Sequence, residues 1–127
     1  MDKTQKRFLI IAGLFLLLGV GVGAFGAHGL KPILSARALE TYQTGVTYMF
    51  SHGLALMALT LVSIVTKINL KLPLNFISWG IVFFSFNCIL SAVTGVKFFG
   101  IIVPIGGVLF ILGWLSFILK MAKAKHA

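Results

Sequence analysis

Residues 8–27 read FLIIAGLFLLLGVGVGAFGA, twenty consecutive residues without a charged side chain. A helix rises about 1.5 Å per residue, so a run of this length crosses a hydrocarbon layer about 30 Å thick. A secretory signal is the alternative, because the basic stretch KTQKR precedes the run and small residues end it. The apolar region of a signal is usually about 7–15 residues long, so we interpret residues 8–27 as a membrane span.

Three further runs of similar length follow at residues 45–66, 74–94 and 100–119. Of the 127 residues, 59% are hydrophobic and 10% are charged, whereas soluble domains contain about 25% charged residues. The short connections leave no room for a soluble domain. We therefore expect residues 1–127 to form one all-α domain, an integral membrane four-helix bundle.

The connection before the second span is expected to contain a helix of its own. Pro32 prevents the first helix from continuing, and Ser35 has the chemistry of an N-cap, with good helix formers behind it. We therefore expect a short extracytoplasmic helix before span two, which either runs at the membrane surface or continues straight into span two.

The net charge of +9 is distributed unevenly along the chain. Eight basic residues lie before span one, between spans two and three, or after span four, and three lie in the other two connections. Short loops rich in Lys and Arg remain in the cytoplasm. We therefore expect a multi-pass protein of the cell membrane, the bacterial inner membrane, with both termini in the cytoplasm.

The basic residues are expected to meet the headgroups of membrane lipids rather than nucleic acid. Anionic headgroups attract Lys and Arg near the membrane surface. Aromatic residues that would stack on bases do not interleave with these basic residues, so no nucleic-acid partner is expected.

Small residues recur at helical spacing in the first and fourth spans. In a membrane, such strips let helix backbones approach closely. The residues expected to serve helix packing are Gly19, Gly23, Ala27, Gly106 and Gly107. A glycine-lined ligand groove is the alternative reading of the strip in span one.

Five polar residues fall at or beneath the outer ends of the spans. They are His28, Glu40, Tyr48, His52 and Asn87. Tyr48 and His52 are four residues apart, one helical turn, so their side chains can touch. Polar groups inside a membrane normally face the protein interior or water. We therefore expect an outer-half site for a small ligand, a lipid headgroup or a partner helix, in which His52 contacts Tyr48, Asn87 or the backbone near Pro104. The alternative is that these residues only link neighbouring helices.

Catalysis is not expected. Asp2 and Glu40 are the two acidic residues of the chain, so no carboxylate pair serves as general acid and base. Cys88 is the single cysteine, which gives no thiolate metal cluster. No metalloprotease, nucleophile-elbow or phosphate-loop motif is present. The prediction is a protein without metal or cofactor. The alternatives to the binding site are a small oligomeric transporter or proton-linked subunit and a purely structural assembly factor, with a second copy or another membrane protein as partner.

Three stretches resemble a known family. They are GAFGAHGLK at 23–31, TYQTGVTYMFSHGLAL at 41–56 and PIGGVLFILGW at 104–114, and they resemble the family of unknown function numbered 423. The resemblance covers nearly the whole chain, including its length, span count and motif order. It implies a four-span membrane protein and transfers no established activity.

Overall fold

The structure, a computed structural model, describes residues 1–125, and within them the chain forms four long apolar helical stretches. The elements are α1 (Lys3–Phe25), η1 (Gly26–Leu30), α2 (Ala36–Thr66), α3 (Lys71–Ile81), η2 (Val82–Phe86), α4 (Asn87–Thr94) and α5 (Lys97–Lys123). The two η elements are π-helical turns that continue α1 and join α3 to α4. Each stretch is long and apolar enough to cross a membrane. The predicted all-α bundle of four apolar helices is confirmed.

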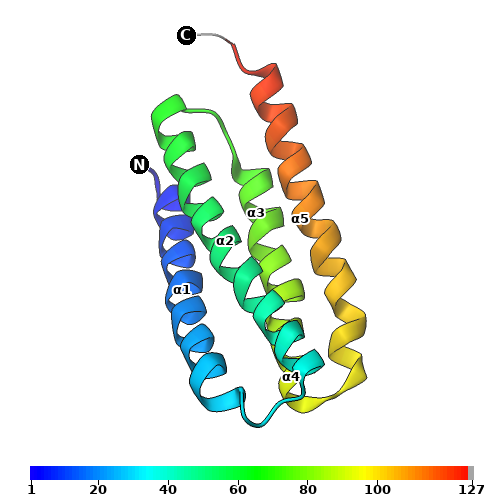
Figure 1. The fold of residues 1–127 in the computed structure, drawn as a ribbon. Coiled ribbons are helices and arrows are strands. Elements are labelled where there is room, and N and C mark those ends of the chain that lie inside the picture. Colours follow the sequence, from blue (N-terminus) through cyan, green and yellow to red (C-terminus); the bar gives the residue numbers. More distant parts are fainter. Residues whose placement is uncertain (126–127) are drawn as a thin grey trace.

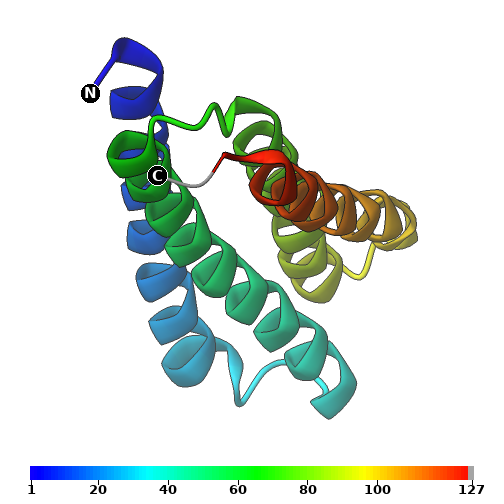
Figure 2. The same cartoon turned by 90° about the horizontal axis from the view of Figure 1, so that it is seen from above.

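The four stretches lie side by side, with the start of α1 and the end of α5 at the same end of the bundle (Figure 1). α1 packs mainly against α2, and α3 packs mainly against α5. α2 also packs against α3 and α4, so it joins the two pairs (Figure 2). The core lies along this junction, where Met49 and Leu56 of α2 and Ile77 and Ile81 of α3 are fully buried.

The helix expected before span two continues straight into it, because residues 36–44 are the first turns of α2, and no separate short helix precedes α2 in residues 31–35. Ser35 is the N-cap, as predicted, and its Oγ accepts the Ala38 N–H at 3.1 Å. The residues that follow favour helix and include no Pro. Gly45 does not interrupt the helix. It is the position at which α2 packs closely against α4. A Cβ at Gly45 would lie 2.8 Å from Cβ of Cys88.

The glycine strip of α1 faces α2 over part of its expected length. A Cβ at Gly19 would lie 3.1 Å from Phe50 Cδ2, and one at Gly23 would lie 3.2 Å from Val46 Cγ1. Ala27 does not continue the strip, because its side chain is exposed. The π-helical turn that begins at Gly26 changes the number of residues per turn, and this rotates Ala27 away from α2.

Gly26 takes the buried position beneath the ring of Tyr42. A Cβ at Gly26 would lie 2.2 Å from Tyr42 Cε1. The Tyr42 hydroxyl donates a hydrogen bond to the backbone oxygen of Val22 in α1. This contact between α1 and α2 was not predicted.

In α5, Gly106 packs closely against η2 and Gly107 does not. A Cβ at Gly106 would lie 2.3 Å from the backbone nitrogen of Phe84, whereas one at Gly107 would meet Phe84 Cδ2 at 3.9 Å. The backbones of α5 and η2 therefore approach closely at Gly106 and not at Gly107.

Candidate functional site

His52 lies half-buried on α2, beside α5. Its ring stacks on Phe110 of α5, with ring centroids 3.9 Å apart and planes inclined by 23°. Tyr48, one turn earlier on α2, lies 5.6 Å from His52 with nearly parallel rings. Phe84 of η2 approaches Tyr48 with centroids 4.7 Å apart. The structure thus brings Tyr48 and His52 together, within an aromatic cluster supplied by three elements.

Both ring nitrogens of His52 have hydrogen-bond partners within the chain. The indole N–H of Trp114 donates to His52 Nε2 at 3.1 Å. Because an indole nitrogen only donates, Nε2 must be the unprotonated acceptor. In the neutral ring the proton is therefore on Nδ1, which lies 3.2 Å from the Tyr48 backbone oxygen. This arrangement fixes the tautomer of His52 and ties α2 to α5.

Trp114 was not predicted as part of the site. Its one sequence signal is its place five residues before the end of the run at 100–119, toward the interface where membrane tryptophans are enriched. Without the fold, that signal does not identify His52 as its partner.

The amide of Asn87 serves its own helix. Its Nδ2 donates to the backbone oxygens of Val82 at 3.3 Å and Phe83 at 2.9 Å. These carbonyls belong to the π-helical turn η2, where regular α-helical pairing is interrupted. Asn87 therefore stabilises the turn.

His28 and Glu40 are exposed, His28 in η1 and Glu40 on α2. Glu40 lies twelve residues before His52 on a continuous helix, which is about 18 Å. Because α2 begins at Ala36, His52 is close to the middle of this 31-residue helix rather than near its outer end. The structure thus does not join His28, Glu40 or Asn87 to the Tyr48–His52 pair.

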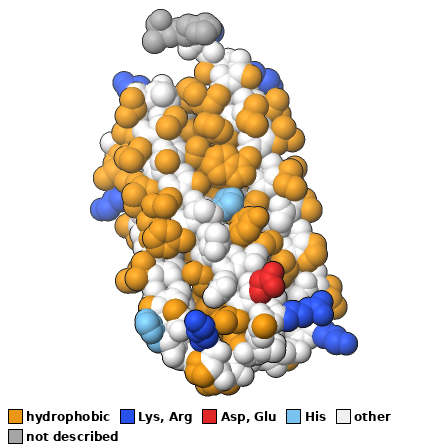
Figure 3. All heavy atoms as spheres, in the orientation of Figure 1, with side chains coloured by type: hydrophobic (Ala, Val, Ile, Leu, Met, Phe, Trp, Pro, Cys, Tyr) orange, Lys and Arg blue, Asp and Glu red, His pale blue; other side chains and the backbone are white. Residues whose placement is uncertain are grey.

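A band of small and polar side chains runs along α2 next to His52. We call it the α2 stripe: exposed Thr47, Ser51 and Ala58, with half-buried Thr44 and Ala55 between them. In Figure 3 white atoms extend below the central pale-blue histidine toward the red acidic side chain, among orange hydrophobic side chains. Tyr48 borders the stripe with 40% of its surface exposed. Polar side chains are therefore accessible here at the depth of a membrane span.

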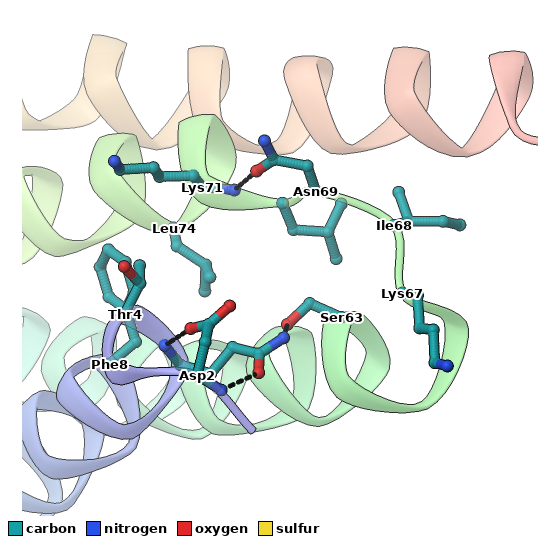
Figure 4. A pocket seen from close by; sticks show the side chains of 11 residues that line it. Asp2, Thr4, Phe8, Ser63, Lys67, Ile68, Asn69, Lys71 and Leu74 are labelled. Carbon is teal, nitrogen blue, oxygen red and sulfur yellow. Dashed lines mark hydrogen bonds between the residues drawn. The ribbon is translucent and has the colours of Figure 1, made fainter.

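A polar cleft of about 350 Å³ opens at the end of the bundle where α1 begins (Figure 4). Asp2 and Gln5 form a capping box at the start of α1, and Gln5 Nε2 donates to Ser63 Oγ of α2 at 3.4 Å. Lys67 and Lys71 line the same cleft. This cleft is formed by α1, α2 and the start of α3, and Tyr48, His52 and Trp114 do not line it.

Within residues 1–125, no group of three or more His, Cys, Asp or Glu side chains is placed to hold a metal ion.

The fold and these polar groups define a small all-α membrane protein with four candidate spans. The chain belongs to the family described as a protein of unknown function, DUF423, which matches residues 22–107. The resemblance inferred from the sequence is confirmed.

Curated relatives match over nearly their full length. The UPF0382 membrane protein of Staphylococcus saprophyticus is 44% identical over 123 residues, covering 94% of this chain and 99% of the relative. A UPF0382 membrane protein of Staphylococcus epidermidis is 42% identical over 119 residues, covering 94% and 98%. One of Staphylococcus haemolyticus is 40% identical over 123 residues, covering 94% and 98%. No solved structure matches the chain. The chain is thus a multi-pass membrane protein.

Proposed function

We propose that this protein is a non-catalytic membrane protein that binds a transmembrane helix of another polypeptide along the α2 stripe. The observation that carries the proposal is the exposure of the Thr47 and Ser51 side chains on a membrane-spanning helix. The Ser51 hydroxyl donates within its own helix to the Tyr48 backbone oxygen at 3.3 Å. Lipid offers hydroxyls no further hydrogen-bond partner, and polar residues in spans normally face protein or water. A second helix supplies both cover and polar partners.

The shape of the stripe favours a helix over a small ligand. Its side chains are small, from Thr44 to Ala58, and small residues let two helix backbones approach closely in a membrane. His52 is not free to hold a ligand, since Trp114 and the Tyr48 backbone occupy its two ring nitrogens. In this account, the hydrogen bond between Trp114 and His52 holds α5 beside the α2 stripe and stabilises the conformation of the stripe.

The orientation we propose places both termini in the cytoplasm. Eight of the eleven Lys and Arg residues lie at the termini or in the connection around Lys67, and such loops stay on the cytoplasmic side. The relatives come from staphylococci, which are Gram-positive, so the proposed location is the cell membrane and not an inner membrane in particular.

The proposal is tested by co-purification from membranes of the native host. A tagged chain in mild detergent should retain a second, differently tagged copy or one other membrane protein in fixed ratio. Ser51→Phe and Ala58→Phe place bulk on the stripe and should abolish retention. Leu17→Phe adds the same ring at a position on α1 that is 68% exposed, and should leave retention unchanged.

Two outcomes contradict helix binding. One is a wild-type chain that retains no protein, and the other is equal loss in Leu17→Phe. Solute uptake into proteoliposomes of the purified chain alone would instead support the transporter alternative.

A further inference from the structure

A second hollow, independent of the α2 stripe, lies between α1 and α3. It is a groove of about 430 Å³, lined by residues of α1 and α3 and by the first residue of η2. α1 packs mainly on α2 and α3 mainly on α5, so the side chains of α1 and α3 leave an open channel between them. Its volume falls in the range of about 300–1,000 Å³ typical of sites for small organic molecules.

The groove changes character along its length. Arg7 of α1 and Lys71 and Asn75 of α3 line the part near the termini. Leu14 and Leu18 of α1 line it further along α1. The groove is therefore basic and polar at one end and apolar at the other, as a phospholipid is anionic at one end and apolar at the other.

The length of the groove matches one leaflet of a bilayer. From Arg7 to Leu18 on α1, and from Lys71 to Val82 on the neighbouring stretch, the chain advances eleven residues. At about 1.5 Å per residue this is about 16 Å, and half of a hydrocarbon core about 30 Å thick is about 15 Å. An acyl chain lying in the groove would extend from the membrane surface to the midplane.

One acidic residue, Asp2, lies near the positive charge at the mouth of the groove, since it lines the polar cleft that Lys71 also borders. The chain has two acidic residues, Asp2 and Glu40. Asp2 lines the adjacent polar cleft, where its side chain accepts the backbone N–H of Gln5 at 2.7 Å. Glu40 is near the opposite end of α2. Figure 4 shows Lys71 extended beside Leu74 and pointing away from Lys67.

We propose that the groove between α1 and α3 binds one anionic phospholipid of the leaflet that faces the termini, with its phosphate between Arg7 and Lys71 and an acyl chain along Leu14 and Leu18. Arg and Lys both donate charge-assisted hydrogen bonds to phosphate. Both helices also begin at this end, so their amino ends add positive partial charge. The site does not depend on helix docking at the α2 stripe, because no residue of α2 lines the groove.

Native mass spectrometry in neutral detergent tests the site. Wild-type protein mixed with phosphatidylglycerol should carry one lipid, and phosphatidylcholine with the same acyl chains should bind more weakly. Glycerol 3-phosphate, which has the anionic group without the chains, should not compete. The combined Arg7→Gln and Lys71→Gln variant should bind phosphatidylglycerol about thirtyfold more weakly, which corresponds to ~1 kcal/mol for each basic residue.

Two further variants distinguish lipid binding in the groove from non-specific attraction of the lipid to basic residues. Lys3→Gln with Lys6→Gln removes the same charge from the first turns of α1 at side chains that do not line the groove, and binding should remain within about twofold of wild type. Ser78→Phe fills the groove without a change in charge and should abolish the lipid adduct while the melting temperature in detergent is retained.

The proposal is overturned if the Lys3 and Lys6 variant loses as much binding as the Arg7 and Lys71 variant, since the effect would then be diffuse attraction. It is also overturned if phosphatidylcholine binds equally well, if Ser78→Phe folds and still binds, or if the groove is covered by a second copy so that a lipid-free dimer is the species observed.

Discussion

Adjacent glycines in α5 allow a stringent test of the bundle, because Gly106 and Gly107 share a helix and differ in their neighbours. In Gly106→Ala the new methyl would lie 2.3 Å from the Phe84 backbone nitrogen, and reaching the 3.4 Å of ordinary contact requires a shift of about 1.1 Å. The neighbour is backbone and has no rotamer to change, so α5 and η2 must separate. A gap of about 0.5–1 Å already forfeits a quarter to a half of the dispersion energy of each contact.

We expect Gly106→Ala to have a free energy of unfolding about 1–3 kcal/mol below that of Gly107→Ala, the range found for overpacked cores. Both variants gain the same helix propensity, up to about 1 kcal/mol. The difference between their free energies of unfolding therefore measures the cost of packing alone. Gly107→Ala should be as stable as wild type or slightly more stable. Denaturation by SDS in mixed micelles, followed by circular dichroism, measures the difference. Equal stability of the two variants would refute the close approach of α5 to η2.

Three other substitutions follow from the same contacts. Tyr42→Phe removes the hydroxyl that donates to Val22 and should lower the free energy of unfolding by about 1 kcal/mol in the same micelle assay; an unchanged value would mean that the bond is absent. Trp114→Phe removes the donor to His52 and should cost about 0.6–1 kcal/mol, and a cost no greater than that of Trp79→Phe would argue against the link. Lys67 ends α2 with a positive φ of 62°, so Lys67→Gly should raise stability by about 0.5–1 kcal/mol, whereas a loss would indicate that the lysine side chain stabilises this end of the molecule.

The helical architecture was predictable because membrane spans are read from length and polarity alone. The run at residues 8–27 falls inside the first helical stretch, Lys3–Leu30, which continues to both sides of it. The helix expected before span two is the start of α2, in which Gly45 is the small residue that lets α2 approach α4.

The site was less predictable, because it depends on which faces the helices turn toward one another. The Tyr48–His52 contact lies within one helix, so spacing is sufficient to suggest it. The Trp114–His52 bond joins residues 62 positions apart, and a single sequence holds no information on that pairing. The hydrogen bonds that Asn87 donates to carbonyls of the π-helical turn η2 were not predictable, because this turn has no clear sequence signature.

The central claim is that protein covers the α2 stripe in the membrane, and photo-crosslinking in living cells of the native host tests it most directly. A photoreactive residue placed at Ser51 or Ala58 should form a protein adduct of defined mass, identified by mass spectrometry as a second copy or one membrane protein. The same group at Leu17, an exposed residue of α1, should react with lipid alone. Protein adducts from Ser51 and Ala58 with none from Leu17 are the result this account predicts. Lipid adducts alone from all three positions would contradict it.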